Sequence, residues 1–159
     1  SKIGIYFDAI LISTRVSSFK FVVPMINGIL FLEQSLIISS DCAHGTHPNY
    51  VEMHDADHKI FLNEGPVVKY NANMRYATDA PGAAIVKTAA ENANIPLQTF
   101  VSRSDLACGS TIGPLAAAST GIRTVDLGVA QLAMHSAREM CGSEDPAYLA
   151  SLLTKLLQE

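Results

Sequence analysis

The chain has 159 residues, of which 48% are hydrophobic, and its formal net charge is −4 at pH 7. This length fits one domain, or part of a larger one, with a buried core. The Lys and Arg residues are scattered and form no basic stripe, which argues against a nucleic-acid partner. The mean hydropathy of +0.22 is high for a small soluble domain and indicates apolar surface that meets a partner chain or a further segment.

The cysteines and the apolar N-terminal stretch bear on where the protein works. Cys42, Cys108 and Cys141 are an odd number without CxxC spacing, which predicts free thiols in a reducing compartment. The stretch FKFVVPMINGILFLEQSLII (19–38) is interrupted by lysine, proline, asparagine and glutamate, whereas a spanning helix needs about 20 mostly uncharged residues. We therefore interpret it as a buried strand and helix rather than a membrane segment, and we find no signal peptide.

The first half of the chain predicts strands followed by a capped helix. Residues 1–30 are rich in Ile, Val and Phe and favour strands, with a break around 24–28. FLEQSLIIS (31–39) predicts a short helix, and GPVVKYNAN (65–73) predicts a strand because a β-branched run is flanked by Gly, Pro and Asn. Asp79 before Ala-Pro predicts the start of a helix that ends near residue 93, before the next proline.

The second half alternates strands with helices. Strands are predicted over 97–102 and 121–128, with a Gly- and Ser-rich loop (102–114) and a short helix, LAAAS, between them. Ser143 and Asp145-Pro146 predict a final helix with leucines on one face. This alternation predicts an α/β/α sandwich with a mostly parallel sheet, in which functional loops gather where the strands end.

Four of the five histidines cluster in SSDCAHGTHPNYVEMHDADH (39–58). Asp and His are ligands that a catalytic zinc prefers, so the cluster is a candidate metal site. The alternative is that these histidines cap turns and bind water, because Gly45 and Pro48 break any helix here. His54 and His58 lie at i, i+4 spacing with acidic residues between them, which favours a solvated face over a ligand pair. Spacing alone leaves both interpretations open.

Two downstream motifs are ambiguous on their own. His135 lies in the Met-rich apolar segment LAMHSAREM, which by itself favours a hydrogen-bonded core histidine. The loop DLACGSTIGP could bind an anion through its backbone N–H groups. Ser110 has no neighbouring base and Cys108 has no motif around it, which argues against nucleophilic catalysis.

Four segments together resemble a known family. SSDCAHGTHPNY, GPVVKYNANMRYAT, RSDLACGSTIGP and VDLGVAQLAMHSAREM resemble, in this order, the C-terminal part of the aspartyl aminopeptidase family of zinc exopeptidases. The resemblance extends over residues 36–142, and residues 1–35 do not match the family. We therefore expect the chain, 1–159, to be the C-terminal part of a zinc-aminopeptidase catalytic domain of the α/β/α exopeptidase type.

The resemblance implies a metal and a specificity for acidic residues. Asp41 matches the carboxylate ligand of one zinc, and His135 matches the imidazole ligand of the second zinc of a pair. Lys69 matches the lysine that pairs with the acidic side chain of the substrate's first residue, and His44 and Tyr76 match pocket residues. A buried lysine would favour such side chains and leave a neutral one facing an unpaired charge.

Further expectations concern the pocket wall and the assembly. His47 matches a histidine linked to the pocket and to subunit assembly, and the backbone of Gly109, Ser110 and Thr111 matches a wall of the pocket. The resemblance implies peptide substrates with N-terminal Asp or Glu, a cytoplasmic enzyme and a homo-oligomer, a dodecamer in the family. No nucleic-acid or membrane partner is expected.

The ligand set of this chain is incomplete. The family's pattern also needs a further histidine, an aspartate that bridges both metals and a Glu-Glu pair that supplies a ligand and the general base, and none of these motifs is present. No catalytic general base is therefore assigned, and the chain alone is expected to be inactive. The alternative is a truncated, non-catalytic relative that keeps the fold and serves as an oligomerising or structural module.

Overall fold

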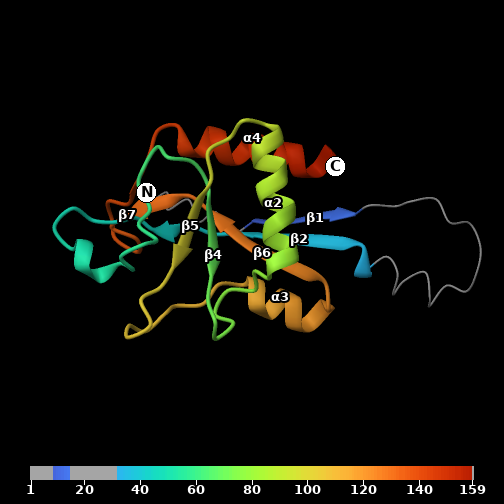
Figure 1. Cartoon of the computed structure of the whole chain (residues 1–159), viewed down its shortest axis with the longest axis horizontal. Helices are drawn as coiled ribbons and strands as arrows, with labels where there is room; N and C mark the ends of the chain where they lie inside the picture. The colour runs from blue at the N-terminus through green and yellow to red at the C-terminus, as the bar shows by residue number, and fades with distance from the viewer. Residues whose placement is uncertain (1–8, 15–31, 159) are drawn as a thin grey trace, which may run out of the picture.

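A mixed five-stranded sheet forms the centre of the molecule (Figure 1). The computed structural model describes residues 9–14 and 32–158. The strands lie in the order β1 (Ala9–Thr14), β2 (Ser35–Ser40), β6 (Arg123–Gly128), β4 (Val67–Tyr70) and β5 (Gln98–Val101). The pairs β2–β6 and β4–β5 are parallel, and the pairs β1–β2 and β4–β6 are antiparallel.

A smaller sheet continues from the carboxyl ends of β2 and β6. It contains β3 (Ala43–His44), β7 (Ala130–Leu132) and β8 (Met140–Cys141). The backbone N–H of Asp41 donates to the carbonyl of Leu127, and β3 then pairs with β7 in parallel. The two segments that leave the central sheet therefore stay side by side, which brings the loops that follow them to the same edge.

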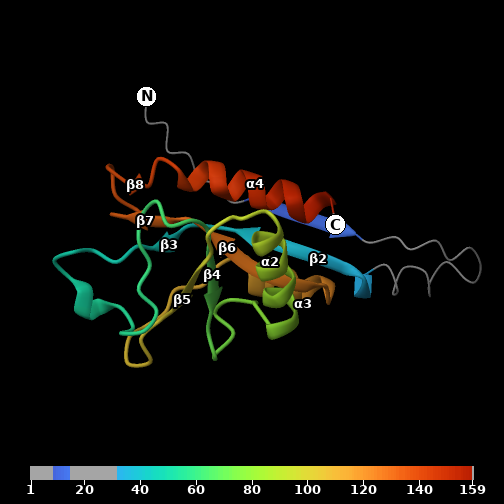
Figure 2. The ribbon, with the colours of Figure 1, turned by 45° about the horizontal axis from the view of Figure 1, so that its top comes forward.

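Helices cover both faces of the central sheet, so the expected α/β/α architecture is confirmed. The helices are η1 (Val51–Met53), α2 (Ala80–Asn92), α3 (Gly113–Thr120) and α4 (Asp145–Gln158). α2 and α4 lie on the same face of the sheet in both ribbon views (Figures 1 and 2). Their buried residues pack against Val125 and Leu127 of β6. The first residue of α3 lies against Asp126, whose side chain points to the opposite face because neighbouring strand residues alternate.

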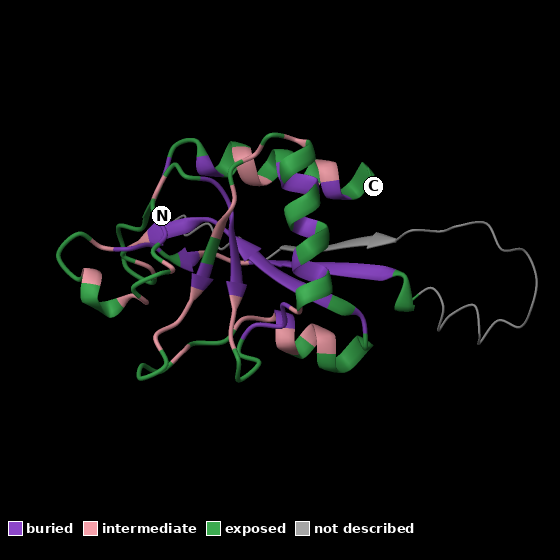
Figure 3. Ribbon diagram, viewed as in Figure 1, coloured by how far each residue is buried: buried purple, intermediate pink, exposed green. Residues whose placement is uncertain are grey.

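The core of the protein lies between the sheet and the α2–α4 pair. Strands β2, β4 and β6 are buried along most of their length, whereas α2 and α4 are buried only on their inner sides (Figure 3). The buried residues of this cluster are Leu36, Ile38, Val68, Val86, Ala89, Ala90, Val125, Leu127, Leu152 and Leu156. The predicted leucine face of the last helix is confirmed, since its Leu152 and Leu156 belong to this core.

One predicted element is wrong, and several are confirmed. Residues 31–39 do not form the expected helix, because Ser35–Ser40 is a strand with all six residues buried. Its Ile37 and Ile38 are β-branched and the strand is paired on both edges, which decides against a helix. The strands predicted over 65–73, 97–102 and 121–128 are present.

The N-terminal expectations are tested only in part. β1 confirms strand structure within 1–30, whereas the break expected at 24–28 lies outside the described residues. Within the ranges that the structure describes, no helix combines the length and the apolar composition needed to cross a bilayer.

The start of α2 is stabilised as its sequence predicts. The Asp79 carboxylate accepts a hydrogen bond from the backbone N–H of Gly82 at 2.7 Å, and proline occupies the first turn. The other carboxylate oxygen pairs with Arg123 at 2.9 Å in a partly exposed ion pair.

Asp79→Ala should lower the free energy of unfolding by about 1 kcal/mol, because the first turn of α2 loses its capping acceptor. Asp79→Asn should cost clearly less, because asparagine caps a helix as well as aspartate and an exposed ion pair contributes little. Urea denaturation of both variants measures the difference. Equal losses would show that the Arg123 pair, and not the cap, carries the effect.

Candidate functional site

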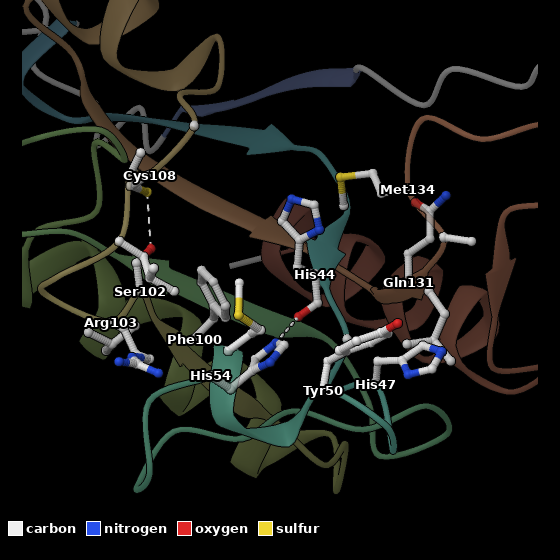
Figure 4. A pocket seen from close by; sticks show the side chains of 18 of the residues that line it. His44, His47, Tyr50, His54, Phe100, Ser102, Arg103, Cys108, Gln131 and Met134 are labelled. Atoms are coloured by element: carbon white, nitrogen blue, oxygen red, sulfur yellow. Dashed lines mark hydrogen bonds between the residues drawn. The ribbon is translucent and has the colours of Figure 1, made fainter.

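A pocket of about 430 Å³ lies beyond the carboxyl ends of β2 and β6, where the small sheet meets two loops. Strand β3 and the segment after it supply His44 and His54, the end of β5 and the loop after it supply Phe100 and Cys108, and β7 supplies Gln131 (Figure 4). Functional loops were expected at this edge, where parallel strands end. The pocket is therefore the candidate site.

Lys69 is a buried cation beneath this pocket. It lies on β4 between β5 and β6, and 1% of its side chain is exposed. Its Nζ donates to the backbone carbonyls of Asp41 at 3.0 Å and Cys42 at 3.2 Å and lies 3.3 Å from the Asp41 carboxylate. This burial shows that Lys69 is not a solvated lysine on the protein surface.

Tyr76 separates Lys69 from the pocket. The Nζ of Lys69 lies 5.2 Å from the centre of the Tyr76 ring, and the same ring lines the pocket and meets Phe100 edge to face. Burial raises the pKa of the Tyr76 phenol well above its usual range, and a hydrogen bond with Cys108 raises it further. The phenol therefore stays protonated and can donate a hydrogen bond at neutral pH.

His44 lies at the centre of the candidate site. Packing around its ring lowers its pKa below 6.5, and the nearby charges of His135, His54 and Lys69 lower it further, in that order, while Asp41 opposes the shift. His44 is therefore a neutral imidazole at pH 7.

His54 is a pocket residue rather than part of a solvated helical face. The residues after η1 do not continue as a helix, so His54 and His58 do not share a helical face. The Nε2 of His54 donates to the carbonyl of His44 at 2.9 Å, since a carbonyl can only accept (Figure 4). His58 bonds to Asp55 at 2.7 Å and does not line the pocket.

Asp41 directly follows β2, and His135 follows β7. His135 is exposed, so it is not the core histidine that its apolar context favours. Its φ is +66°, a left-handed conformation that is uncommon for a residue with a side chain, and its N–H donates to Glu139 at 2.6 Å. Such backbone strain is found preferentially at functional sites.

The remaining predicted pocket residues divide into two groups. His47 and Gly109 line the pocket, and His47 accepts a hydrogen bond from the backbone N–H of Asn49. Ser110 and Thr111 are not among the residues that line the pocket, and the Ser110 hydroxyl donates to the carbonyl of Arg75 at 3.2 Å. The geometry leaves the proposed roles of these residues in binding and assembly as predictions.

A family comparison accounts for this arrangement. The family model for the aminopeptidase I zinc metalloproteases (M18) matches residues 10–156. The chain belongs to the M18 family. This confirms the resemblance to the zinc exopeptidases, and zinc is the metal of the family. The match begins at residue 10, so it includes most of the stretch 1–35, in which the motifs alone showed no resemblance to the family.

The M18 relatives are much longer than this chain. A probable M18 family aminopeptidase 2 of Streptomyces coelicolor is 54% identical over 124 residues, which are 78% of this chain and 29% of the relative. One of Pseudomonas fluorescens is 51% identical over 123 residues, 77% of this chain and 29% of the relative. The chain therefore spans less than a third of these proteins.

Solved M18 structures share the fold. The structure of the Ape4 and Nbr1 complex matches with a TM-score of 0.81 and 46% identity, over 82% of this chain and 25% of that one. The S. cerevisiae mApe1 dodecamer matches with a TM-score of 0.75 and 32% identity, over 89% of this chain and 30% of that one.

Two residues of this M18 chain are candidate zinc ligands. The carboxylate of Asp41 and the imidazole of His135 are donors that zinc prefers, so they fit the metal in kind. Within 9–14 and 32–158, however, no group of three or more His, Cys, Asp or Glu side chains is placed to hold an ion. These residues can supply ligands to a site that other residues complete.

Sequence reasoning missed one residue that lines the pocket and one that lies outside its lining. His54 was assigned to a solvated face because its i, i+4 partner suggested a helix that does not form. Asp126 was not singled out, although it is fully buried and its carboxylate accepts hydrogen bonds from Ala77 and Thr111, which lie in two different loops. The signal for Asp126 was a lone carboxylate within the apolar strand sequence TVDLG.

The Lys69–Asp41 pair can be tested without any assay of activity. Asp41→Ala should destabilise the metal-free protein by about 1–3 kcal/mol, because Lys69 stays buried without its counter-ion. Lys69→Met should cost less, and adding Asp41→Ala to it should cost little more, since no charge is left to satisfy. Chemical denaturation in a double-mutant cycle measures this coupling. Strictly additive losses would show that the pair contributes nothing.

Proposed function

We propose that the protein carrying this chain removes N-terminal Asp or Glu from peptides by a two-zinc hydrolytic mechanism. The observation that carries this proposal is Lys69, a buried cation one aromatic ring away from the pocket. Membership of the M18 family supports the class of reaction, and the substrate preference rests on Lys69. Because the chain spans less than a third of its relatives, the general base and the missing ligands are assigned to the rest of the protein.

Lys69 is suited to select an acidic side chain. Burial removes it from water, so a carboxylate that reaches it forms a stronger interaction than on the surface. In the described residues its anionic partner is Asp41, at 3.3 Å. A substrate with a neutral first side chain would not supply a carboxylate to Lys69, so its affinity would be lower than that of an acidic substrate.

Asp41 and His135 are proposed to hold one zinc each. Zinc, when bound, orients the attacking water and polarises the scissile carbonyl. The charge of Asp41 is then shared with the metal, and Lys69 is left to attract the substrate carboxylate. The left-handed turn at His135, held by Glu139, would fix the direction of its imidazole.

Pocket residues are proposed to orient the peptide. His44 is neutral at pH 7, so it can hydrogen-bond to the substrate without adding a second cation beside Lys69. The phenol of Tyr76 can donate a hydrogen bond, and the backbone of Gly109, Ser110 and Thr111 is proposed to form one wall. The buried ring of Phe100 is proposed to exclude water on the inner side.

We also propose that the protein is a homo-oligomer in the cytoplasm. The mApe1 neighbour is a dodecamer, which supports a homo-oligomer, and His47 at the pocket's edge is the residue proposed to link pocket and assembly. All three cysteines are free thiols, which supports a reducing, cytoplasmic compartment.

A non-catalytic module is the second candidate. The observation that favours it is the absence of a three-ligand cluster within the described residues. Such a protein would keep the fold and associate with other chains through its apolar surface.

Lys69→Met in the complete enzyme should reduce the preference for aspartyl over leucyl substrates by about ten- to a hundredfold. A hydrogen bond to a charged group contributes roughly 1.5–3 kcal/mol, and methionine keeps the length without the charge. The ratio of kcat/KM for the two substrates measures discrimination. An unchanged ratio would show that another residue selects the acidic side chain.

The 159-residue chain alone should bind zinc weakly and show negligible hydrolysis of aspartyl substrates, because it offers one proposed ligand to each metal. Elemental analysis after dialysis measures the bound zinc. Stoichiometric zinc, or turnover that a chelator abolishes, would show that the chain holds ligands beyond Asp41 and His135.

A further inference from the structure

We propose that Asp126 is a positioning residue that holds two loops together behind the pocket and so sets its affinity for substrate. This inference rests on the proposed function for its effect on the substrate, but not for the structural link itself. Asp126 lies on β6, and none of its surface is exposed. It does not line the pocket, so it acts only through its neighbours.

The carboxylate of Asp126 joins two segments that are far apart in the sequence. One oxygen accepts the backbone N–H of Ala77 at 2.6 Å, directly after Tyr76. The other accepts the hydroxyl of Thr111 at 2.5 Å, two residues after Gly109. Both Tyr76 and Gly109 line the pocket, so the buried carboxylate of Asp126 connects the two loops that carry these pocket residues.

Neighbouring contacts reinforce this link. The backbone N–H of Asp126 donates to the Thr78 hydroxyl at 2.9 Å. Ser110 donates to the carbonyl of Arg75, which ties the same two loops a second time. Gly113 leaves room for the carboxylate, since a Cβ there would overlap it. The close approach of Gly113 to the Asp126 carboxylate indicates that the carboxylate occupies one specific position between the loops.

The choice of a carboxylate has a physical reason. Buried charge is costly, and it is tolerated when hydrogen-bond donors satisfy it. A carboxylate only accepts, so it can bind donors from both loops at the same time without a choice of orientation. An apolar residue here would leave the N–H of Ala77 and the hydroxyl of Thr111 without their acceptor.

Three variants test the proposal in the complete protein. Asp126→Ala should raise KM for an aspartyl substrate by about tenfold, with kcat changed by less than about threefold, because binding rather than chemistry depends on the loops. Thr111→Val removes one link with little change in shape and should raise KM less. Asp126→Asn should restore most of the affinity, because the Thr111 hydroxyl can also accept a hydrogen bond.

Asp145→Ala is the matched control. Asp145 is equally buried and accepts the backbone N–H groups of Asn63 and Gly65, but these residues do not line the pocket. This variant should lower the melting temperature as Asp126→Ala does, while KM stays at the wild-type value. An equal rise of KM in both variants would overturn the proposal, since general destabilisation would then explain it.

Hydrogen exchange supplies a readout that needs no substrate. Asp126→Ala should speed exchange of the amides at 76–78 and 109–112 by about tenfold or more, whereas Thr111→Val should affect chiefly 109–112. Unchanged exchange, unchanged KM, or failure of Asp126→Asn to restore affinity would overturn the proposal. If the wild-type enzyme does not cleave aspartyl substrates, the proposed function fails, and the exchange pattern still decides whether Asp126 holds the loops.

Discussion

A lysine without access to water organises the centre of this protein. Lys69 is placed in the middle of a sheet, where a charge is stable only if acceptors surround it. The segment after β2 supplies two backbone carbonyls and the side-chain carboxylate of Asp41, so the turn at Asp41 and Cys42 must pass directly over the Lys69 amine. That turn leads into β3, and the position of β3 in turn decides where His44 faces the pocket.

The polar residues in and around the pocket differ in their burial and in their hydrogen-bond partners. Two buried polar side chains, Lys69 and Asp126, lie outside the lining of the pocket, and each is hydrogen-bonded to backbone groups as well as to a side chain. Desolvation lowers the pKa of the His44 imidazole and raises the pKa of the Tyr76 phenol, so the charged form of each of these pocket residues is disfavoured.

The proposed zinc ligands of this chain, Asp41 and His135, agree in kind with the metal of the M18 family. The chain covers less than a third of its relatives, and the described residues offer zinc donors of the right kind in too small a number. A site shared among distant segments needs a rigid frame on each side. Here the frame is the small sheet beyond β2 and β6, which keeps the segments that begin at Asp41 and Val129 side by side.

The sequence by itself determined the elements whose signals are local, and the motifs that identify the family. The cap at Asp79, the strand at 67–70 and the leucine face of α4 follow from short-range preferences, which act in any context. Tertiary structure decided the rest. Residues 35–40 became a strand because partners lie on both edges, and His54 joined the pocket because the chain turns back after η1. The burial of Lys69 and the link at Asp126 depend on contacts across 28 and 49 positions of sequence, which no local pattern encodes.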